Sequence, residues 1–210
     1  MKRTSLQRKT PLRAKTPLKR SGFKNKGKVG LERKTRLKPT AGAKKVAKQS
    51  KQAIPKWLKA VPESKAHGSG TYQKRLWKLT SDYVRIRDWH KYGVCVATGT
   101  KIEHYKDGHA GHLKPYSTCN AIFKFDVRNI HMQHGNSNKF GNYDTFRDFE
   151  KVVKNRGYDW DKFERENNKA NGSRLYDSDV IKEAKKVLTL MKKLPEQPEY
   201  FERAYNLLQE

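Results

Sequence analysis

Three residues whose side chains could together hydrolyse a phosphodiester occur in the order His, Asn, Asn: His112, Asn129 and Asn138. Such a cut requires a base that activates water and a cation that neutralises charge building on the phosphate. A neutral histidine near its unperturbed pKa suits the first task at physiological pH. An asparagine carbonyl is a hard oxygen ligand suited to Mg²⁺, and the central Asn129 would tie the loop to the strand and orient the base.

Ordinary surface chemistry could also account for these residues. Some of the seven histidines could be solvated polar side chains, and loops rich in asparagine and glycine, such as residues 129–143, are common turns. The order and spacing of the three residues favour the catalytic interpretation, because the charge of this chain already indicates a nucleic-acid partner.

A helix and several short strands are the elements that must position this group. A helix is expected from Thr71 to a stop at Gly93, because four apolar residues fall on one helical stripe: Leu76, Leu79, Tyr83 and Ile86. Strands are expected around residues 101–105, 108–114 and 122–127. The middle strand would carry His109 and His112.

The remainder of the chain has helical patterns. One helix is expected within residues 143–153, and a short helix with a loop within residues 157–173. Ser178 is expected to cap a further helix, and prolines at 195 and 198 separate it from a last helix that begins near Phe201.

Length and charge narrow the class of protein. The chain has 210 residues, which suits one domain with an appendage, and 48 Lys and Arg against 21 Asp and Glu give a formal net charge of +27. Nucleic acid is the natural partner, since the basic stretches lack the apolar face that membrane binding needs. No membrane span or signal peptide is recognised, so we expect a cytoplasmic location. The two cysteines, Cys95 and Cys119, are too few for a disulfide framework.

Residues 1–70 are expected to form a disordered basic arm. Residues 1–60 contain one acidic residue, Glu32, and short repeats such as Lys9–Leu12 and Lys15–Leu18 space cations along an extended backbone. A solvated tail and a nonspecific DNA-binding arm are compatible interpretations. The candidate DNA contacts are Arg8, Lys9, Arg13, Lys15, Lys19, Arg20, Lys34, Arg36 and Lys38.

The His, Asn, Asn layout resembles that of HNH endonucleases, in which a strand, strand, helix unit holds one divalent metal. Four stretches also resemble, in the same order, the phage NinG (Rap) family: "LWKLTSDYVRIRDWHKYGVC", "AGHLKP", "FKFDVRNIHMQHGNSNKFGNY" and "SRLYDSDVIKEAK". The resemblance implies a metal-dependent, structure-specific endonuclease that cuts branched DNA, such as Holliday junctions and displacement loops, during phage recombination. If the protein is encoded by a phage, as the resemblance implies, it would act in the cytoplasm of the host cell.

The resemblance also implies roles for individual residues. His112 would be the general base, Asn129 the orienting residue and Asn138 a metal ligand, with His131 as a second ligand or phosphate contact. Many HNH enzymes have aspartate immediately before the base, where this chain has Gly111. His109 could supply a substitute ligand, because residues two apart on a strand face the same side. The expected catalytic metal is Mg²⁺ or Mn²⁺.

The family's zinc-binding knuckles are degenerate in this chain. The first would read Cys95 to Thr98 and the second His134 to Ser137. Structural zinc needs four Cys or His ligands, and Thr98 and Ser137 are poor substitutes, so we expect no structural zinc.

The sequence therefore predicts an α+β domain over residues 71–210, with an HNH ββα-metal core and flanking helices behind the basic arm. The expected activity is that of an HNH-type endodeoxyribonuclease. Two alternatives remain: a non-catalytic DNA-binding accessory protein with a degenerate HNH scaffold, supported by Gly111 and the missing cysteines, and an RNA-binding protein, suggested by the arm alone. A homodimer would suit symmetric junction cleavage, and other phage recombination proteins are candidate partners.

Overall fold

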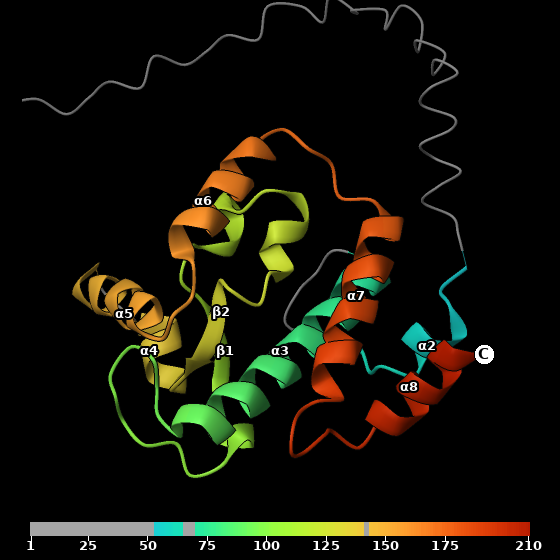
Figure 1. Cartoon of the computed structure of the whole chain (residues 1–210), viewed down its shortest axis with the longest axis horizontal. Helices are drawn as coiled ribbons and strands as arrows, with labels where there is room; N and C mark the ends of the chain where they lie inside the picture. The colour runs from blue at the N-terminus through green and yellow to red at the C-terminus, as the bar shows by residue number, and fades with distance from the viewer. Residues whose placement is uncertain (1–52, 65–69, 141–142) are drawn as a thin grey trace, which may run out of the picture. The chain divides into compact units, whose positions relative to one another are not determined.

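The longest helix of the fold, α3 (Thr71–Tyr92), packs against both strands and against helix α7 (Asp177–Met191) (Figure 1). The computed structural model describes residues 53–64, 70–140 and 143–210, which all lie in one compact unit. The predicted helix is confirmed: its apolar stripe is buried, and Gly93 ends it with a left-handed φ of 66°. Glycine adopts this conformation without a Cβ penalty, which explains the stop.

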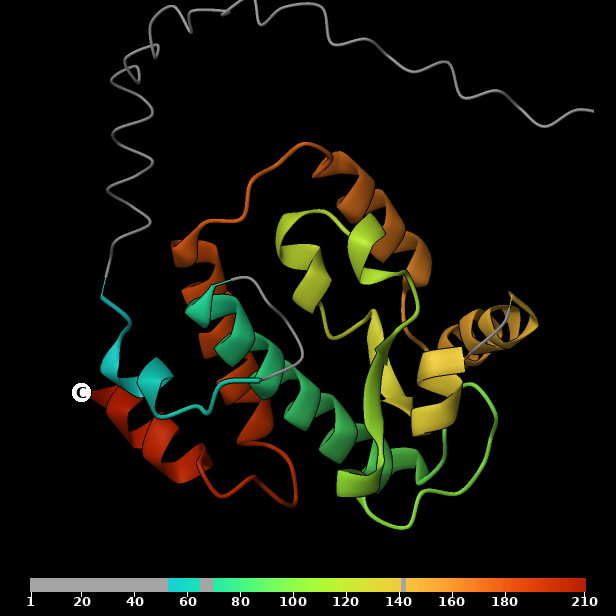
Figure 2. The same cartoon turned by 180° about the vertical axis from the view of Figure 1, so that it is seen from behind.

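Two short strands form the sheet of the described residues, and helix α4 follows them. β1 (His109–His112) pairs antiparallel with β2 (Ile130–Gln133), with His109 opposite Gln133 and His112 opposite Ile130. α4 (Gly135–Phe140) begins two residues after β2 and packs against β1. In chain order these elements are strand, strand, helix, and together with the surrounding helices they make an α+β fold (Figure 2).

The strand predictions were right for one segment and wrong for two. β1 lies inside the predicted 108–114 strand. Of residues 101–105, only Lys101 forms a bridge, with Val94, and a 3₁₀ turn, η1, occupies Tyr105–Asp107. Residues 122–127 fall largely on another 3₁₀ turn, η3 (Ala121–Phe125), because a three-residue period directs Ile122 and Phe125 into the same core.

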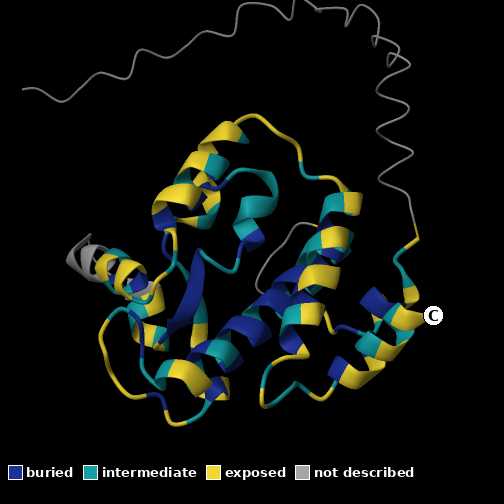
Figure 3. Cartoon of the chain, viewed as in Figure 1, coloured by how far each residue is buried: buried dark blue, intermediate teal, exposed yellow. Residues whose placement is uncertain are grey.

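β2 was not predicted as a separate strand, although its four residues alternate apolar Ile130 and Met132 with polar His131 and Gln133. All four are buried, so the two polar side chains are as inaccessible as the two apolar ones (Figure 3). The alternation alone would place the polar positions on a solvated face, and the structure covers both faces instead.

The predicted helices after residue 142 are present. They are α5 (Tyr143–Asn155), α6 (Trp160–Lys169), α7 and α8 (Phe201–Gln209). The predicted cap at Ser178 was two residues late, because Tyr176 is the N-cap of α7. α7 begins at Asp177, and the carboxylate of Asp179 accepts a hydrogen bond from the Tyr176 N–H at 3.2 Å. A 3₁₀ turn, η2 (Tyr116–Thr118), connects β1 toward η3.

The predicted domain boundary at residue 71 is too late. A short helix, α2 (Lys56–Lys59), packs against α8 and α3, and Trp57, Leu58 and Val61 are buried in the main core (Figure 1). Arg75 fixes this segment, because its Nη1 donates to the carbonyl of Lys59 at 2.9 Å. The few apolar residues of α2 are buried by distant elements, which local composition does not reveal.

The predicted arm contacts, from Arg8 to Lys38, lie outside the described residues, as does the predicted disorder of residues 1–52. Over the part of the chain that the structure describes, no helix is long and apolar enough to cross a membrane.

Candidate functional site

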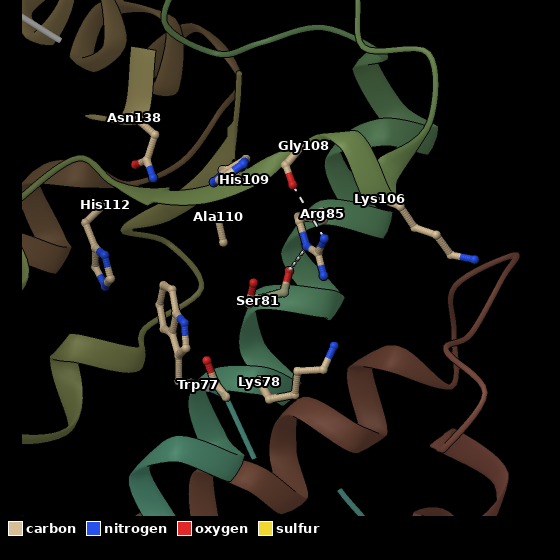
Figure 4. A pocket seen from close by; sticks show the side chains of 11 residues that line it. Trp77, Lys78, Ser81, Arg85, Lys106, Gly108, His109, Ala110, His112 and Asn138 are labelled. Atoms are coloured by element: carbon tan, nitrogen blue, oxygen red, sulfur yellow. Dashed lines mark hydrogen bonds between the residues drawn. The ribbon is translucent and has the colours of Figure 1, made fainter. Parts of the chain in front are cut away.

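A cavity of about 430 Å³ lies along the edge of β1 that does not pair with β2 (Figure 4). His109, His112 and Asn138 all line it, although they come from two different elements. Asn138 and His109 lie on one side of the β1 ribbon and His112 on the other, so the cavity joins both faces of the strand at its edge. The remaining lining residues are Ser64, Trp77, Lys78, Ser81, Arg85, Lys106, Gly108 and Ala110.

The imidazole of His112 is held by three contacts. Its ring stacks on Trp77 of α3, with centroids 5.1 Å apart and planes 12° from parallel, and meets Tyr116 edge to face at 5.7 Å. Its Nε2 lies 2.8 Å from the carbonyl oxygen of Lys124. A carbonyl only accepts hydrogen bonds, so Nε2 carries the proton and, in the neutral ring, Nδ1 is the basic nitrogen.

Asn129 joins the start of β2 to the segment after β1. Its side chain is fully buried, with Oδ1 accepting from the Lys114 N–H at 2.7 Å and Nδ2 donating to the Lys114 carbonyl at 3.0 Å. Nδ2 also donates to the Sγ of Cys119 at 3.2 Å. This pair of bonds fixes the backbone two residues after His112.

The space beside Gly111 is already occupied. A Cβ at this position would lie 2.5 Å from Asn138 Oδ1 and 2.5 Å from the amide of Gln133, which itself is only 4% exposed. An aspartate at residue 111, immediately before His112, therefore does not fit this arrangement, because Gln133 and Asn138 fill the space that its side chain would need.

A divalent cation could be held by His109 and Asn138 at this edge. Both line the cavity, and the His109 ring packs over Gly135 at the start of α4, where its Nε2 would lie 3.1 Å from an added Cβ. The donors are one imidazole nitrogen and one amide oxygen, and the described lining residues include no carboxylate. This mixed, neutral set fits a first-row transition ion such as Mn²⁺ better than Mg²⁺, which prefers oxygen ligands.

His131 does not lie in the cavity, so its predicted contact with metal or phosphate is wrong for this structure. Its side chain is fully buried, with Nε2 3.0 Å from the Arg128 carbonyl and Nδ1 3.4 Å from Arg87 Nη2. Both ring nitrogens are engaged within the fold. His131 pairs with Gly111 across the two strands, so both lie on the same face of the sheet. Gly111 borders the Asn138 side chain there, whereas the His131 ring is buried in the core.

A buried ionic group surrounds His131. Asp88 of α3 accepts from the Met132 N–H at 2.8 Å and from Arg87 Nε at 2.7 Å, and lies 3.5 Å from His131 Nδ1. Burial alone would raise the pKa of Asp88, but Arg87 and His131 hold it well below its usual range. Burial lowers the pKa of His131 below the ordinary histidine value, although Asp88 opposes this shift.

The two degenerate knuckles come together without a set of zinc ligands. The Cys95 Sγ lies 3.3 Å from Ser137 Oγ and accepts from the His134 N–H at 3.2 Å. Burial raises the pKa of the Cys95 thiol, but hydrogen bonds from Ser137, Thr98 and the His134 backbone outweigh it and lower the pKa overall. The described residues contain no group of three His, Cys, Asp or Glu suited to a metal.

Cys119 does not join Cys95 in a shared metal-binding group among the described residues. It lies with Asn129 and the Lys114 carbonyl, and burial raises the pKa of its thiol to about 11.

The sequence did not indicate several residues of the site. Trp77 was expected only as core, and it is indeed mostly buried, while its contact with His112 follows from the packing of α3 on β1. Lys78, Arg85 and Lys106 also line the cavity, but in a chain with 48 lysines and arginines they carry no distinguishing signal.

The comparisons with known proteins give one match. The family model described as Bacteriophage Lambda NinG protein matches residues 9–196, which extends the resemblance into the N-terminal repeats. Comparisons with curated proteins and with solved structures find no match. Because the family model covers most of the chain, including every residue of the cavity, this chain belongs to the phage NinG family.

Proposed function

We propose that this chain is a metal-dependent endonuclease of the HNH type that acts on DNA. The observation that carries the proposal is the cavity at the β1 edge, which His112, with a fixed tautomer, lines together with Asn138 and His109. The strand, strand, helix order of β1, β2 and α4 supports an HNH-type core. Membership of the NinG family supports a role in phage recombination.

In the proposed reaction, water attacks the phosphorus in line with the leaving sugar oxygen. His112 Nδ1 accepts the proton from that water, while the hydrogen bond from Nε2 to Lys124 keeps the ring in the required tautomer. Asn129 anchors Lys114, which holds the segment that follows the base. His109 and Asn138 would hold the divalent cation, which when bound neutralises charge developing on the phosphate and the leaving oxygen.

DNA is the proposed substrate because of charge and family. The net charge of +27 favours a polyanion, and the basic residues between Arg8 and Lys38 would add affinity that depends on salt but not on base sequence. Branched DNA, such as a Holliday junction or displacement loop, is the substrate that the family resemblance implies. Symmetric resolution of a junction would require two active sites, and hence a homodimer.

Cleavage of a labelled four-way junction and a matched linear duplex tests the proposal directly. Wild-type protein should cut in Mn²⁺, less in Mg²⁺ and not in EDTA, with a preference for the junction. His112→Ala should reduce cutting by at least a hundredfold while binding changes by less than about threefold, because only the base is removed. His90→Ala, on α3 outside the described cavity lining, is the matched control and should retain activity.

A non-catalytic accessory protein is the second candidate. The observation that favours it is the lack of a carboxylate among the described residues of the cavity. Tight junction binding with no cutting in either metal would establish this alternative and refute the nuclease assignment.

A further inference from the structure

We propose that one polar stripe of α3 forms a track for a single nucleic-acid strand that leads away from His112. The track is defined by Lys78, Ser81 and Arg85 of α3 together with Lys106 of η1. This inference rests on the proposed nuclease function, because it assigns the path that the substrate backbone takes on leaving the cavity.

Two adjoining cavities share the cations of the track. The cavity that contains His112 and a second cavity of about 630 Å³ are both lined by Lys78, Arg85 and Lys106. The two cavities therefore adjoin at these three side chains, and His112 lines only the first cavity. Figure 4 shows the Lys78, Arg85 and Lys106 side chains on the side of Trp77 away from His112.

The spacing on α3 suits a sugar–phosphate backbone. Lys78, Ser81 and Arg85 are three and seven residues apart, so they lie on one face of the helix. Seven residues of α-helix span roughly 10 Å, which is long enough for the stripe to contact more than one phosphate of a strand. The hydroxyl of Ser81 lies between the two cations and is a suitable donor to a phosphate oxygen.

Asp82 fixes the two cations of α3 from beneath. Its carboxylate is only 2% exposed, accepts from Lys78 Nζ at 2.8 Å, pairs with Arg85 and accepts from the Tyr200 hydroxyl at 2.9 Å. Arg85 also lies 3.4 Å from the Gly108 carbonyl. The cations are therefore held in place before a ligand arrives, which reduces the entropy lost on binding.

Charge remains on the track after this pairing. Asp82 is one carboxylate shared between two cations, and Lys106 is exposed. The described lining of the first cavity contains three cations and no carboxylate, so an anionic backbone is favoured there.

The acidic lining of the second cavity marks the end of the track. Glu196 and Glu199 line that cavity together with Tyr200. These carboxylates repel a phosphate backbone, so the strand turns away where the stripe on α3 meets them.

Ser81→Glu tests the track without removing a partner of Asp82. Binding of the full chain to a fluorescent four-way junction and to a single-stranded oligonucleotide is measured in EDTA, by anisotropy across a range of KCl concentrations. The added carboxylate lies between two phosphate-binding cations, so affinity should fall about tenfold. Ser178→Glu adds the same charge to the exposed first turn of α7 and should change affinity by less than twofold.

Lys106→Ala tests the track independently, through the salt dependence of DNA binding, at an exposed side chain. The slope of log affinity against log salt concentration should decrease by about one, as expected for loss of one phosphate contact, whereas Lys101→Ala on the neighbouring loop should leave it unchanged. Equal binding by Ser81→Glu and Ser178→Glu would overturn the track.

A tethering experiment locates the strand. Ser81→Cys should form a disulfide with DNA that carries a thiol tether within a few nucleotides of the cut site, while Ser178→Cys should not. The native Cys95 and Cys119 are buried, so the introduced thiol is the accessible one. Cleavage by wild type together with no selective cross-link would reject the track but keep the nuclease. A selective cross-link without cleavage would keep the track and reject the nuclease.

Discussion

At the scale of single residues, the space beside Gly111 is filled by its neighbours. The amides of Gln133 and Asn138 both occupy the volume that a Cβ at residue 111 would take. Both amides lie 2.5 Å from that Cβ position, and Asn138 is the residue that we propose as a metal ligand. The position of Asn138 therefore depends on residue 111 having no side chain.

Gly111→Ala should displace Asn138 without unfolding the domain. The atoms that the new Cβ meets are the ends of flexible side chains, so Mn²⁺ affinity, measured by electron paramagnetic resonance without DNA, should weaken about tenfold while the melting temperature falls by only a few degrees. Gly111→Ala combined with Gln133→Ala relieves the crowding, so the double variant should bind Mn²⁺ more tightly than Gly111→Ala alone. Additive losses would show that the two positions are not coupled.

At this scale, the sequence predicted the residue types that meet at the site better than it predicted their surroundings. His112 and Asn138 do lie in one cavity, and Asn129 does bond the segment after β1. The role expected for His131 came from the family resemblance, which does not record how deeply the ring is buried: Tyr158 and Phe149 cover it, with ring centroids 4.8 and 5.7 Å from that of His131. Nothing local to residue 131 records those contacts.

At the scale of elements, α3 and β2 are joined by buried charge rather than by apolar packing alone. Asp88 bonds the backbone of Met132, and Arg87 donates to the carbonyls of Val127 and Ile130 at 3.0 and 3.1 Å. These bonds set where β2 lies along α3, and hence where α4 begins. Breaking one partner of such a group leaves an uncompensated buried charge.

The same group predicts how stability depends on pH. The folded pKa of His131 is below its ordinary value of 6.5, so the unfolded chain binds a proton more readily and the free energy of unfolding should fall as pH drops below about 7. The folded pKa of Asp88 is also lowered, so its stabilisation is present above about pH 4 and is lost below it.

His131→Asn should flatten the first of these two changes. The amide can keep a bond to the Arg128 carbonyl but does not titrate, so urea unfolding between pH 7 and pH 5 should show a smaller loss of stability than in wild type. His134→Asn, which alters an exposed histidine, should keep the wild-type profile. A wild-type profile in His131→Asn would contradict the assignment of the pH dependence to this ring.

Elements with a one-sided apolar pattern were predicted correctly, as α3, α5 and α7 show. β2 and η3 were not: β2 is an alternating segment of only four residues, and the alternating stretch from Phe123 to Val127 lies largely on a 3₁₀ turn rather than a strand. α2 was missed for a related reason: four residues cannot form a stable helix alone, and this helix exists because α8 and α3 cover it.

At the scale of the whole molecule, the basic N-terminal segment should dominate nonspecific affinity. Deletion of residues 1–50 removes most of the excess positive charge, so DNA binding should weaken and its salt dependence should flatten by several units of log–log slope. The folded part begins its described core at α2, so the deletion should leave the melting temperature nearly unchanged. An unchanged salt slope would show that this segment does not contact DNA.

The docking of α2 has a consequence for avidity. Because α2 is packed into the core and Ser64, a few residues later, lines the cavity, the basic segment is covalently attached close to the proposed site of cutting. Once that segment holds DNA, entry of a strand into the cavity becomes an intramolecular event at a high effective concentration. A weak, neutral metal site and a short track would then be enough for cleavage. The DNA would be kept near the cut site mainly by the attached basic segment rather than by contacts in the cavity.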